Sequence, residues 1–133
     1  IALNISALPN VETSNEPVNV LFLPFGEIHD LGLFFLNYYL KLKGKKTVYL
    51  GKSIPFDNLF YVNSQIKNIT WITYFMIDTT TEEKTMFLNN VEKLVSDNNN
   101  TSIIVGNIWD DFSKKNKNKK IFFKTSLQDL IAN

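Results

Sequence analysis

The sequence predicts an α/β fold, a doubly wound, five-stranded parallel sheet of the Rossmann-like or flavodoxin-like kind. Short apolar runs alternate with helical segments from residue 18 to the end of the chain, which is typical of such sheets. Some runs are apolar at consecutive positions, as at residues 21–23 and 103–105, which indicates strands buried on both faces. The 133 residues, 44% of them hydrophobic, are enough for one continuous core.

The expected elements follow one another along the chain. Residues 1–17, with two prolines and several asparagines and serines, are predicted to form a lead-in or linker, and residues 18–133 the α/β domain. Strands are expected at residues 18–24, 46–50, 69–77, 102–105 and 121–124. Helices are expected at residues 30–43, 55–67, 80–97 and 126–132. Gly44 is expected to end the first helix, Pro55 to open the second, and Thr81 and Ser126 to cap the last two.

Composition narrows the classes of function. The net charge is only +1, and the fourteen basic residues are all lysine, so we expect no direct contact of this domain with nucleic acid. The absence of cysteine excludes thiolate catalysis and cysteine-based metal centres. No apolar run reaches the ~18–20 residues of a membrane span, and residues 1–8 lack the features of a signal peptide. We therefore expect a cytoplasmic domain without a membrane partner, and because residue 1 is not Met, further chain upstream.

The familiar catalytic patterns do not occur. There is no Gly-x-Ser-x-Gly elbow, Walker loop or complete hydrolase triad, so we expect no enzyme. Asp110 and Asp111 leave open a Mg²⁺ site like that of receiver domains, which would need Glu27 and Lys124 to complete it. The lysine-rich residues 114–120 are expected to form a solvated loop. Trp109 is a candidate for lining a ligand pocket, for anchoring a partner, or for a structural role.

The motif that carries chemistry is Gly26-Glu27-Ile28-His29-Asp30-Leu31-Gly32, directly after the first predicted strand. Ligands of doubly wound sheets bind beyond the carboxyl ends of the strands, where this motif places the single histidine, His29. A neutral imidazole can ligate a metal while Glu27 or Asp30 holds its second nitrogen. Gly32 costs the helix about 1 kcal/mol relative to alanine, which suggests close approach of a bulky, flat ligand. The alternative is an ordinary polar helix N-terminus in which both acids favour the helix dipole.

The spacing Glu27-x-His29-x-x-Gly32, followed by Leu50-Gly51 and Ile54-Pro55, resembles cobalamin-binding domains. In particular it resembles the carboxy-terminal sensor domain of MerR-family transcriptional regulators. The resemblance covers residues 18–133 and is densest over residues 24–60. It implies that His29 is the lower axial ligand of the cobalt in cobalamin, that Glu27 supports the imidazole, and that Gly32 clears space for the nucleotide tail.

Two later motifs of that family are altered. The family has Ser-x-Leu or Ser-x-Thr after the third strand, where this chain has Thr73-Tyr74-Phe75, so that Thr73 keeps the hydroxyl. After the fourth strand the family has Gly-Gly, where this chain has Gly106-Asn107. The resemblance places Thr73, Gly106 and Asn107 along the nucleotide tail, and Phe75 and Asn107 are bulky enough to narrow or close that pocket.

We therefore expect the ligand-sensing C-terminal domain of a MerR-type regulator, with cobalamin as candidate cofactor. The expected partners are an upstream helical bundle and a DNA-binding domain of the same polypeptide, and a homo-oligomer is left open. The segment 31–42, apolar nearly all round, is expected to be either a helix central in the domain or a helix whose outer surface packs on such a neighbour. The alternatives are a cofactor-free interaction module with a vestigial pocket, and a cobalamin-carrying subunit of a methyltransferase or mutase.

Overall fold

The computed structural model describes residues 16–24, 30–97 and 99–131. Its sheet has five parallel strands in the order β2-β1-β3-β4-β5. The strands are β1 (Val18–Pro24), β2 (Thr47–Ile54), β3 (Ile69–Tyr74), β4 (Thr101–Val105) and β5 (Ile121–Lys124). The helices are α1 (Leu31–Leu42), α2 (Phe56–Gln65), α3 (Thr81–Val95), the 3₁₀ turn η2 (Asn107–Trp109), α4 (Asp110–Lys115) and α5 (Leu127–Ile131). The predicted doubly wound parallel sheet is confirmed.

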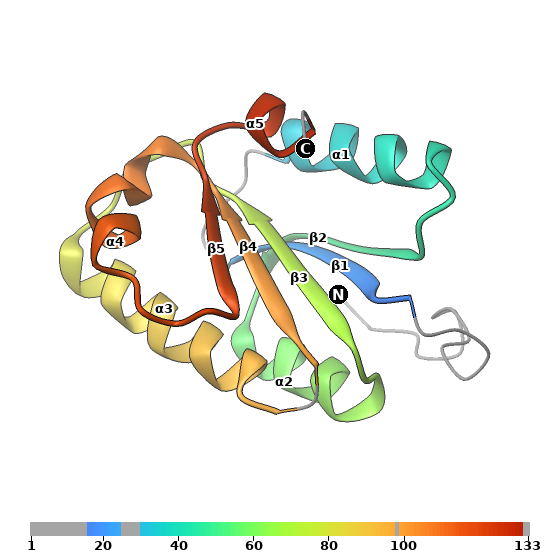
Figure 1. Cartoon of the computed structure of the whole chain (residues 1–133), viewed down its shortest axis with the longest axis horizontal. Helices are drawn as coiled ribbons and strands as arrows, with labels where there is room; N and C mark the ends of the chain where they lie inside the picture. The colour runs from blue at the N-terminus through green and yellow to red at the C-terminus, as the bar shows by residue number, and fades with distance from the viewer. Residues whose placement is uncertain (1–15, 25–29, 98, 132–133) are drawn as a thin grey trace.

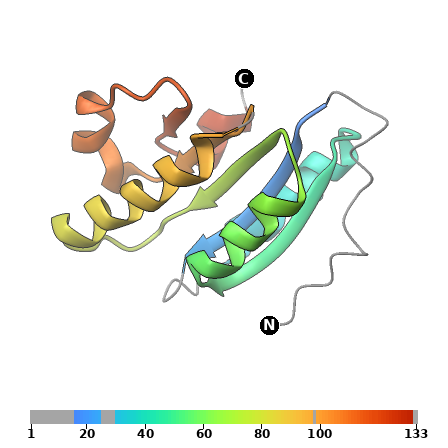
Figure 2. The same cartoon turned by 90° about the horizontal axis from the view of Figure 1, so that it is seen from below.

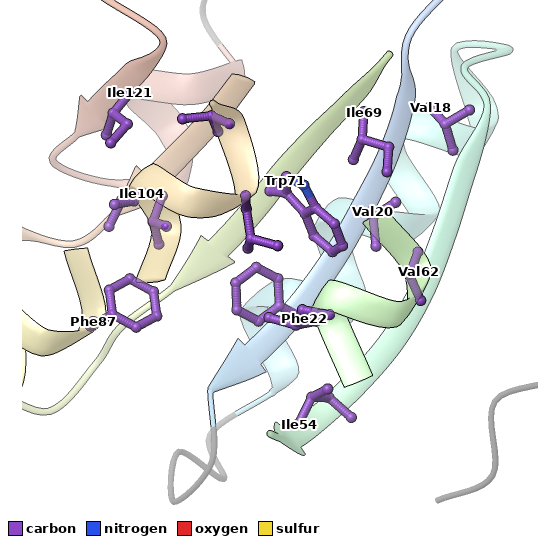
Figure 3. Close-up of a cluster of buried hydrophobic side chains, with 14 of the residues drawn as sticks. Val18, Val20, Phe22, Ile54, Val62, Ile69, Trp71, Phe87, Ile104 and Ile121 are labelled. Carbon is purple, nitrogen blue, oxygen red and sulfur yellow. The ribbon is translucent and has the colours of Figure 1, made fainter. Parts of the chain in front are cut away.

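Helices cover both faces of the sheet, with α1 and α5 on one face and α2 and α3 on the other (Figures 1 and 2). Both faces need a cover because successive apolar side chains of β1 point alternately to the two faces. Val20 and Phe22 belong to the larger core under α2 and α3, which Figure 3 shows around Trp71. Leu21 and Leu23 belong to the smaller core under α1 and α5. The consecutive apolar residues of the strand are thus all buried, as predicted.

Strand β2 runs on past the glycine at which we expected it to end. Gly51 has φ +94° and pairs with Phe22, where the register between β1 and β2 shifts. The positive φ is accommodated as an irregularity within the pairing rather than as a turn. The strand therefore continues to Ile54, and its end reaches the same sheet edge as the end of β1.

Three further details differ from the expected elements. Strand β3 was expected to reach residue 77 but ends at Tyr74, the last residue that pairs with β4, and Met76 and Ile77 are exposed. The cap of α3 is Thr80 rather than Thr81, because the Thr80 hydroxyl accepts a hydrogen bond from the Glu83 amide at 3.1 Å. Helix α4 was not predicted, and its last two residues fall in the segment 114–120 that was expected to form a loop. Its six residues have two acids in the first turn and two lysines in the last, a distribution that the helix dipole favours. Trp109, buried at its start, and Phe112 pack on the larger core and hold the helix in place.

Candidate functional site

The predicted site gathers where the strands end, and part of it lies in the segment between β1 and α1. Glu27 and His29, and with them the predicted cobalt ligand, lie outside the described residues. The described candidates are Asp30 and Gly32 on the α1 side, and Thr73, Gly106 and Asn107 at the ends of β3 and β4. Among the residues with described positions, no group of three or more His, Asp or Glu side chains is arranged to hold a metal ion.

Asp30 occupies the N-cap position of α1, but its side chain makes no capping hydrogen bond. Instead its Oδ2 accepts a hydrogen bond from the Tyr49 hydroxyl of β2 at 3.3 Å. Burial of Tyr49, and then the charge and hydrogen bond of Asp30, raise the pKa of Tyr49 from 10.0 to about 12. This pair therefore ties the start of α1 to the neighbouring strand.

We expect Asp30→Asn to lower the pKa of Tyr49 towards 10, with a residual elevation from burial, which is the largest cause. Since the folded-state pKa is raised above the unfolded value, protonated Tyr49 stabilises the fold below pH 10, and this contribution is lost as the pH rises to about 12. NMR titration of ¹³Cζ-labelled tyrosine would measure the shift, with Asp57→Asn on α2 as control. An unchanged Tyr49 titration in the Asp30 variant would contradict the pairing.

Gly32 faces side chains of its own chain rather than an open space. A Cβ at this position would lie 2.6 Å from Cε2 of Tyr74 and 2.9 Å from Cδ1 of Leu127. Tyr74 ends β3 and Leu127 begins α5, so two distant segments converge on the glycine. Internal packing thus explains why a glycine occupies this position in the first turn of α1.

Thr73 lies on the other face of the sheet from Gly32. Its neighbours at alternate positions, Trp71 and Phe75, belong to the core under α2 and α3, whereas Tyr74 packs under α1. Thr73 is fully buried, and its Oγ1 has no hydrogen-bond partner among the described residues. The structure therefore does not bring the Thr73 hydroxyl and Gly32 together around one space.

Gly106 and Phe75 meet at the ends of β4 and β3. Gly106 has φ +143°, and a Cβ there would lie 2.8 Å from the Phe75 carbonyl oxygen. Asn107, the next residue, is exposed at the start of η2. The bulk that closes the space beside Gly32 comes from Tyr74 and Leu127, not from Phe75 or Asn107. The family resemblance pointed to Phe75 and Asn107, and it gave no signal for Leu127, which α5 brings in from the end of the chain.

The outer surface of α1 is a second candidate site, separate from the residues around Gly32. The helix buries Leu33 and Leu36 against the sheet, as an amphipathic helix does. A second set of large apolar side chains, which we call the outer stripe, is between 52 and 81% exposed. The outer stripe consists of Leu31, Phe34, Phe35, Tyr38 and Leu42. Its spacing of three, four, seven and eleven residues from the first member keeps it along one side of the helix.

The other features that the sequence raised, a Mg²⁺ site at Asp110 and Asp111 and a membrane span, were also compared with the structure. Asp110 and Asp111 are both exposed in the first turn of α4 and contribute to no metal-binding group among the described residues. Over the described part of the chain, no helix is both long enough and apolar enough to cross a membrane. The residues around Gly32 and the outer stripe therefore remain as the candidate functional features among the described residues.

Comparison with known proteins gives a likeness in fold. No family model and no curated protein match the chain. Among solved structures, the chain is similar to a novel cobalamin-binding protein from Desulfitobacterium hafniense DCB-2, with a TM-score of 0.61 and 16% sequence identity. The match covers 89% of this chain and 57% of that one, so this chain spans little more than half of the length of its neighbour. The likeness shows that the two proteins share the fold.

Proposed function

We propose that this chain is the sensor or interaction domain of a MerR-type transcriptional regulator, and that it acts through contacts with the rest of its polypeptide rather than through catalysis. The observation that carries the proposal is the outer stripe of α1. Its five exposed side chains include two phenylalanines and a tyrosine, residues that are enriched in protein interfaces. Large apolar side chains exposed along one side of a helix are typical of a docking site.

The spacing of the outer stripe favours a helix as its occupant. Ridges formed by residues three and four apart on one helix pack into the grooves of another, and Phe34, Phe35 and Tyr38 form such a ridge. Lys41, Lys43 and Lys45 follow at the end of the helix and favour acidic groups on the partner. We infer that the occupant is a helix of a bundle preceding this domain in the same polypeptide, with the DNA-binding domain beyond it.

One likeness in sequence supports the regulatory role, and a second likeness, in structure, supports the fold. The spacing Glu27-x-His29-x-x-Gly32 resembles the sensor domains of MerR-family regulators, and the fold is that of a protein described as cobalamin-binding. A domain of this fold can serve in regulation without catalysis, because fold does not fix function. In this proposal, DNA is bound by another part of the polypeptide.

Cobalamin binding is the second candidate, and the described residues do not fit the cofactor in their present arrangement. Tyr74 and Leu127 occupy the space beside Gly32 that the nucleotide tail would need. Side chains of two separate elements would have to move to open it. The structure therefore favours the cofactor-free form of the proposal.

Titration with hydroxocobalamin distinguishes the two forms. We expect the wild-type protein to retain no cobalamin after desalting and to show no shift in the visible absorption spectrum of the cofactor. The circular dichroism spectrum of the same sample would show that the protein is folded. Retention by the wild type that His29→Ala abolishes would instead establish a cobalamin sensor.

The regulatory role is tested on the complete gene product. We expect it to shift the electrophoretic mobility of DNA from its own promoter at nanomolar concentration, with a strong dependence on salt. Deletion of the domain should alter the response of the regulator while leaving some DNA binding intact. A complete polypeptide without a DNA-binding domain would refute the proposal.

A further inference from the structure

A hollow of about 360 Å³ opens at the carboxyl edge of the sheet, on the face covered by α2 and α3. Its position is the one at which doubly wound sheets bind ligands, and its volume falls in the range of small-molecule sites. The lining comes from the ends of strands, from the start of α2 and from α3. Among the described residues, the lining includes Phe56, Phe75, Phe87, Trp109, Glu83 and Lys84. This hollow is separated by the sheet from the space beside Gly32.

Aromatic rings form one wall of the hollow. The ring centroid of Phe75 lies 5.1 Å from that of Phe87 and 5.1 Å from that of Trp109. Phe56 continues the wall, with its centroid 5.4 Å from that of Phe87. Most of these rings meet edge to face, an arrangement that stabilises the wall. The wall suits a flat apolar ligand that can stack against it.

A buried cation stands beside this wall. The Lys84 side chain is only 10% exposed, and its Nζ donates a hydrogen bond to the Ile108 carbonyl at 2.9 Å and pairs with Asp78 Oδ1 at 2.6 Å. An ammonium group has three donors, so with these two acceptors among the described residues one donor is left for a ligand. The Asp78 side chain is 65% exposed, so it can turn into water when another anion approaches Lys84. Lys84 is therefore placed to hold a carboxylate.

The two tryptophans of the chain differ in a way that makes the hollow testable. Trp71 Nε1 donates a hydrogen bond to Asn63 Oδ1 at 3.3 Å. Trp109 is 1% exposed, and its Nε1 has no acceptor among the described residues. A buried donor without a partner is uncommon in folded proteins and calls for an explanation. Because protein atoms cover it, the Trp109 indole N–H will report on ligand entry without needing to contact the ligand.

We propose that this hollow binds a small aromatic carboxylate, with the aromatic ring against Phe56, Phe75 and Phe87 and the carboxylate on the Lys84 ammonium. The apolar wall and the buried Lys84 ammonium together select a molecule that has one flat ring system and one negative charge. The inference does not depend on docking at the outer stripe, which lies on the opposite side of the sheet. It would supply a sensor domain with a ligand other than cobalamin.

The probes are 2-naphthoate and its neutral amide, 2-naphthamide, added to ¹⁵N-labelled protein. We expect 2-naphthoate to shift the Trp109 indole resonance saturably and to leave that of Trp71 in place, with Trp109→Phe identifying the signal. The amide should bind about ten-fold more weakly, the loss expected for one charge-assisted hydrogen bond. Lys84→Met should reduce the affinity for 2-naphthoate by the same factor, whereas Lys93→Met, at an exposed position of the same helix, should not change it.

The acid–amide comparison in the wild-type protein decides the question if Lys84→Met does not fold. Equal binding of the two probes would overturn the proposal, because the cation would then play no part. The absence of any saturable shift at Trp109 up to about 10 mM would overturn it as well. So would equal shifts at both indoles, which would indicate nonspecific association.

Discussion

Gly106→Ala is expected to lower the free energy of unfolding by about 2–4 kcal/mol, a large part of the stability of a typical small domain. The backbone at Gly106 has φ +143°, a conformation that residues with a Cβ rarely adopt. The new Cβ would also lie 2.8 Å from the Phe75 carbonyl oxygen. That oxygen belongs to the backbone, which is fixed by the hydrogen bond from the Phe75 amide to Val105 at 2.9 Å. Small movements of neighbouring atoms therefore cannot relieve the strain.

Urea unfolding followed by tryptophan fluorescence would measure the loss. Gly44→Ala is the matched control, because Gly44 also has a positive φ of +75° but has nothing within 4 Å of the position of its Cβ. We expect this control to lose only about 1 kcal/mol. Equal losses in the two variants would show that the close approach to Phe75 carries no cost. A large loss would also bear on function, because it would show that the fold requires glycine at position 106 whether or not a ligand binds.

Charge placed on the outer stripe is expected to abolish docking while leaving the domain folded. The double variant Phe35→Glu and Tyr38→Glu should weaken the association of the domain with the rest of the polypeptide by at least about 100-fold, since buried aromatic anchors are often hot spots. Both side chains are exposed, so the free energy of unfolding of the domain should change by no more than about 0.5 kcal/mol. Isothermal calorimetry between the two separately produced parts would measure the affinity.

Tyr61→Glu on α2 is the matched control for this experiment. Tyr61 is 51% exposed, close to the 52% of Phe35, but it lies on the opposite face of the sheet. We expect its substitution to leave the affinity unchanged. Comparable weakening by both variants would mean that charge, rather than the outer stripe, determines the association.

The fold could be predicted from the sequence because its strands are short apolar runs that stand out from the more polar segments between them. Where the prediction was wrong, tertiary contacts overrode the local pattern. Helix α4 has no apolar periodicity of its own and depends on the packing of Trp109 and Phe112. Gly51 looked like a strand end, but pairing with β1 carries β2 through it to Ile54.

The candidate site was harder to predict, because it depends on which face of the sheet each residue occupies. In β3, a shift of one position exchanges Thr73 and Tyr74 between the two faces, and sequence spacing alone does not fix this choice. The sequence did not identify Lys84 as a candidate site residue, because a lysine on an amphipathic helix is ordinarily exposed. It is buried because the Ile108 carbonyl and Asp78 converge on it from other segments.

Cysteine labelling tests the central claim, that α1 docks on another part of its own polypeptide, most directly. The described domain contains no cysteine, so Tyr38→Cys introduces a single reactive group on the outer stripe, and Asn89→Cys on the exposed side of α3 serves as reference. The rate of maleimide labelling would be compared between this chain alone and the complete gene product, with any other cysteine replaced. The account predicts labelling at Tyr38→Cys at least about ten-fold slower in the complete protein, with no change at Asn89→Cys. Equal rates for Tyr38→Cys in the two contexts would contradict it.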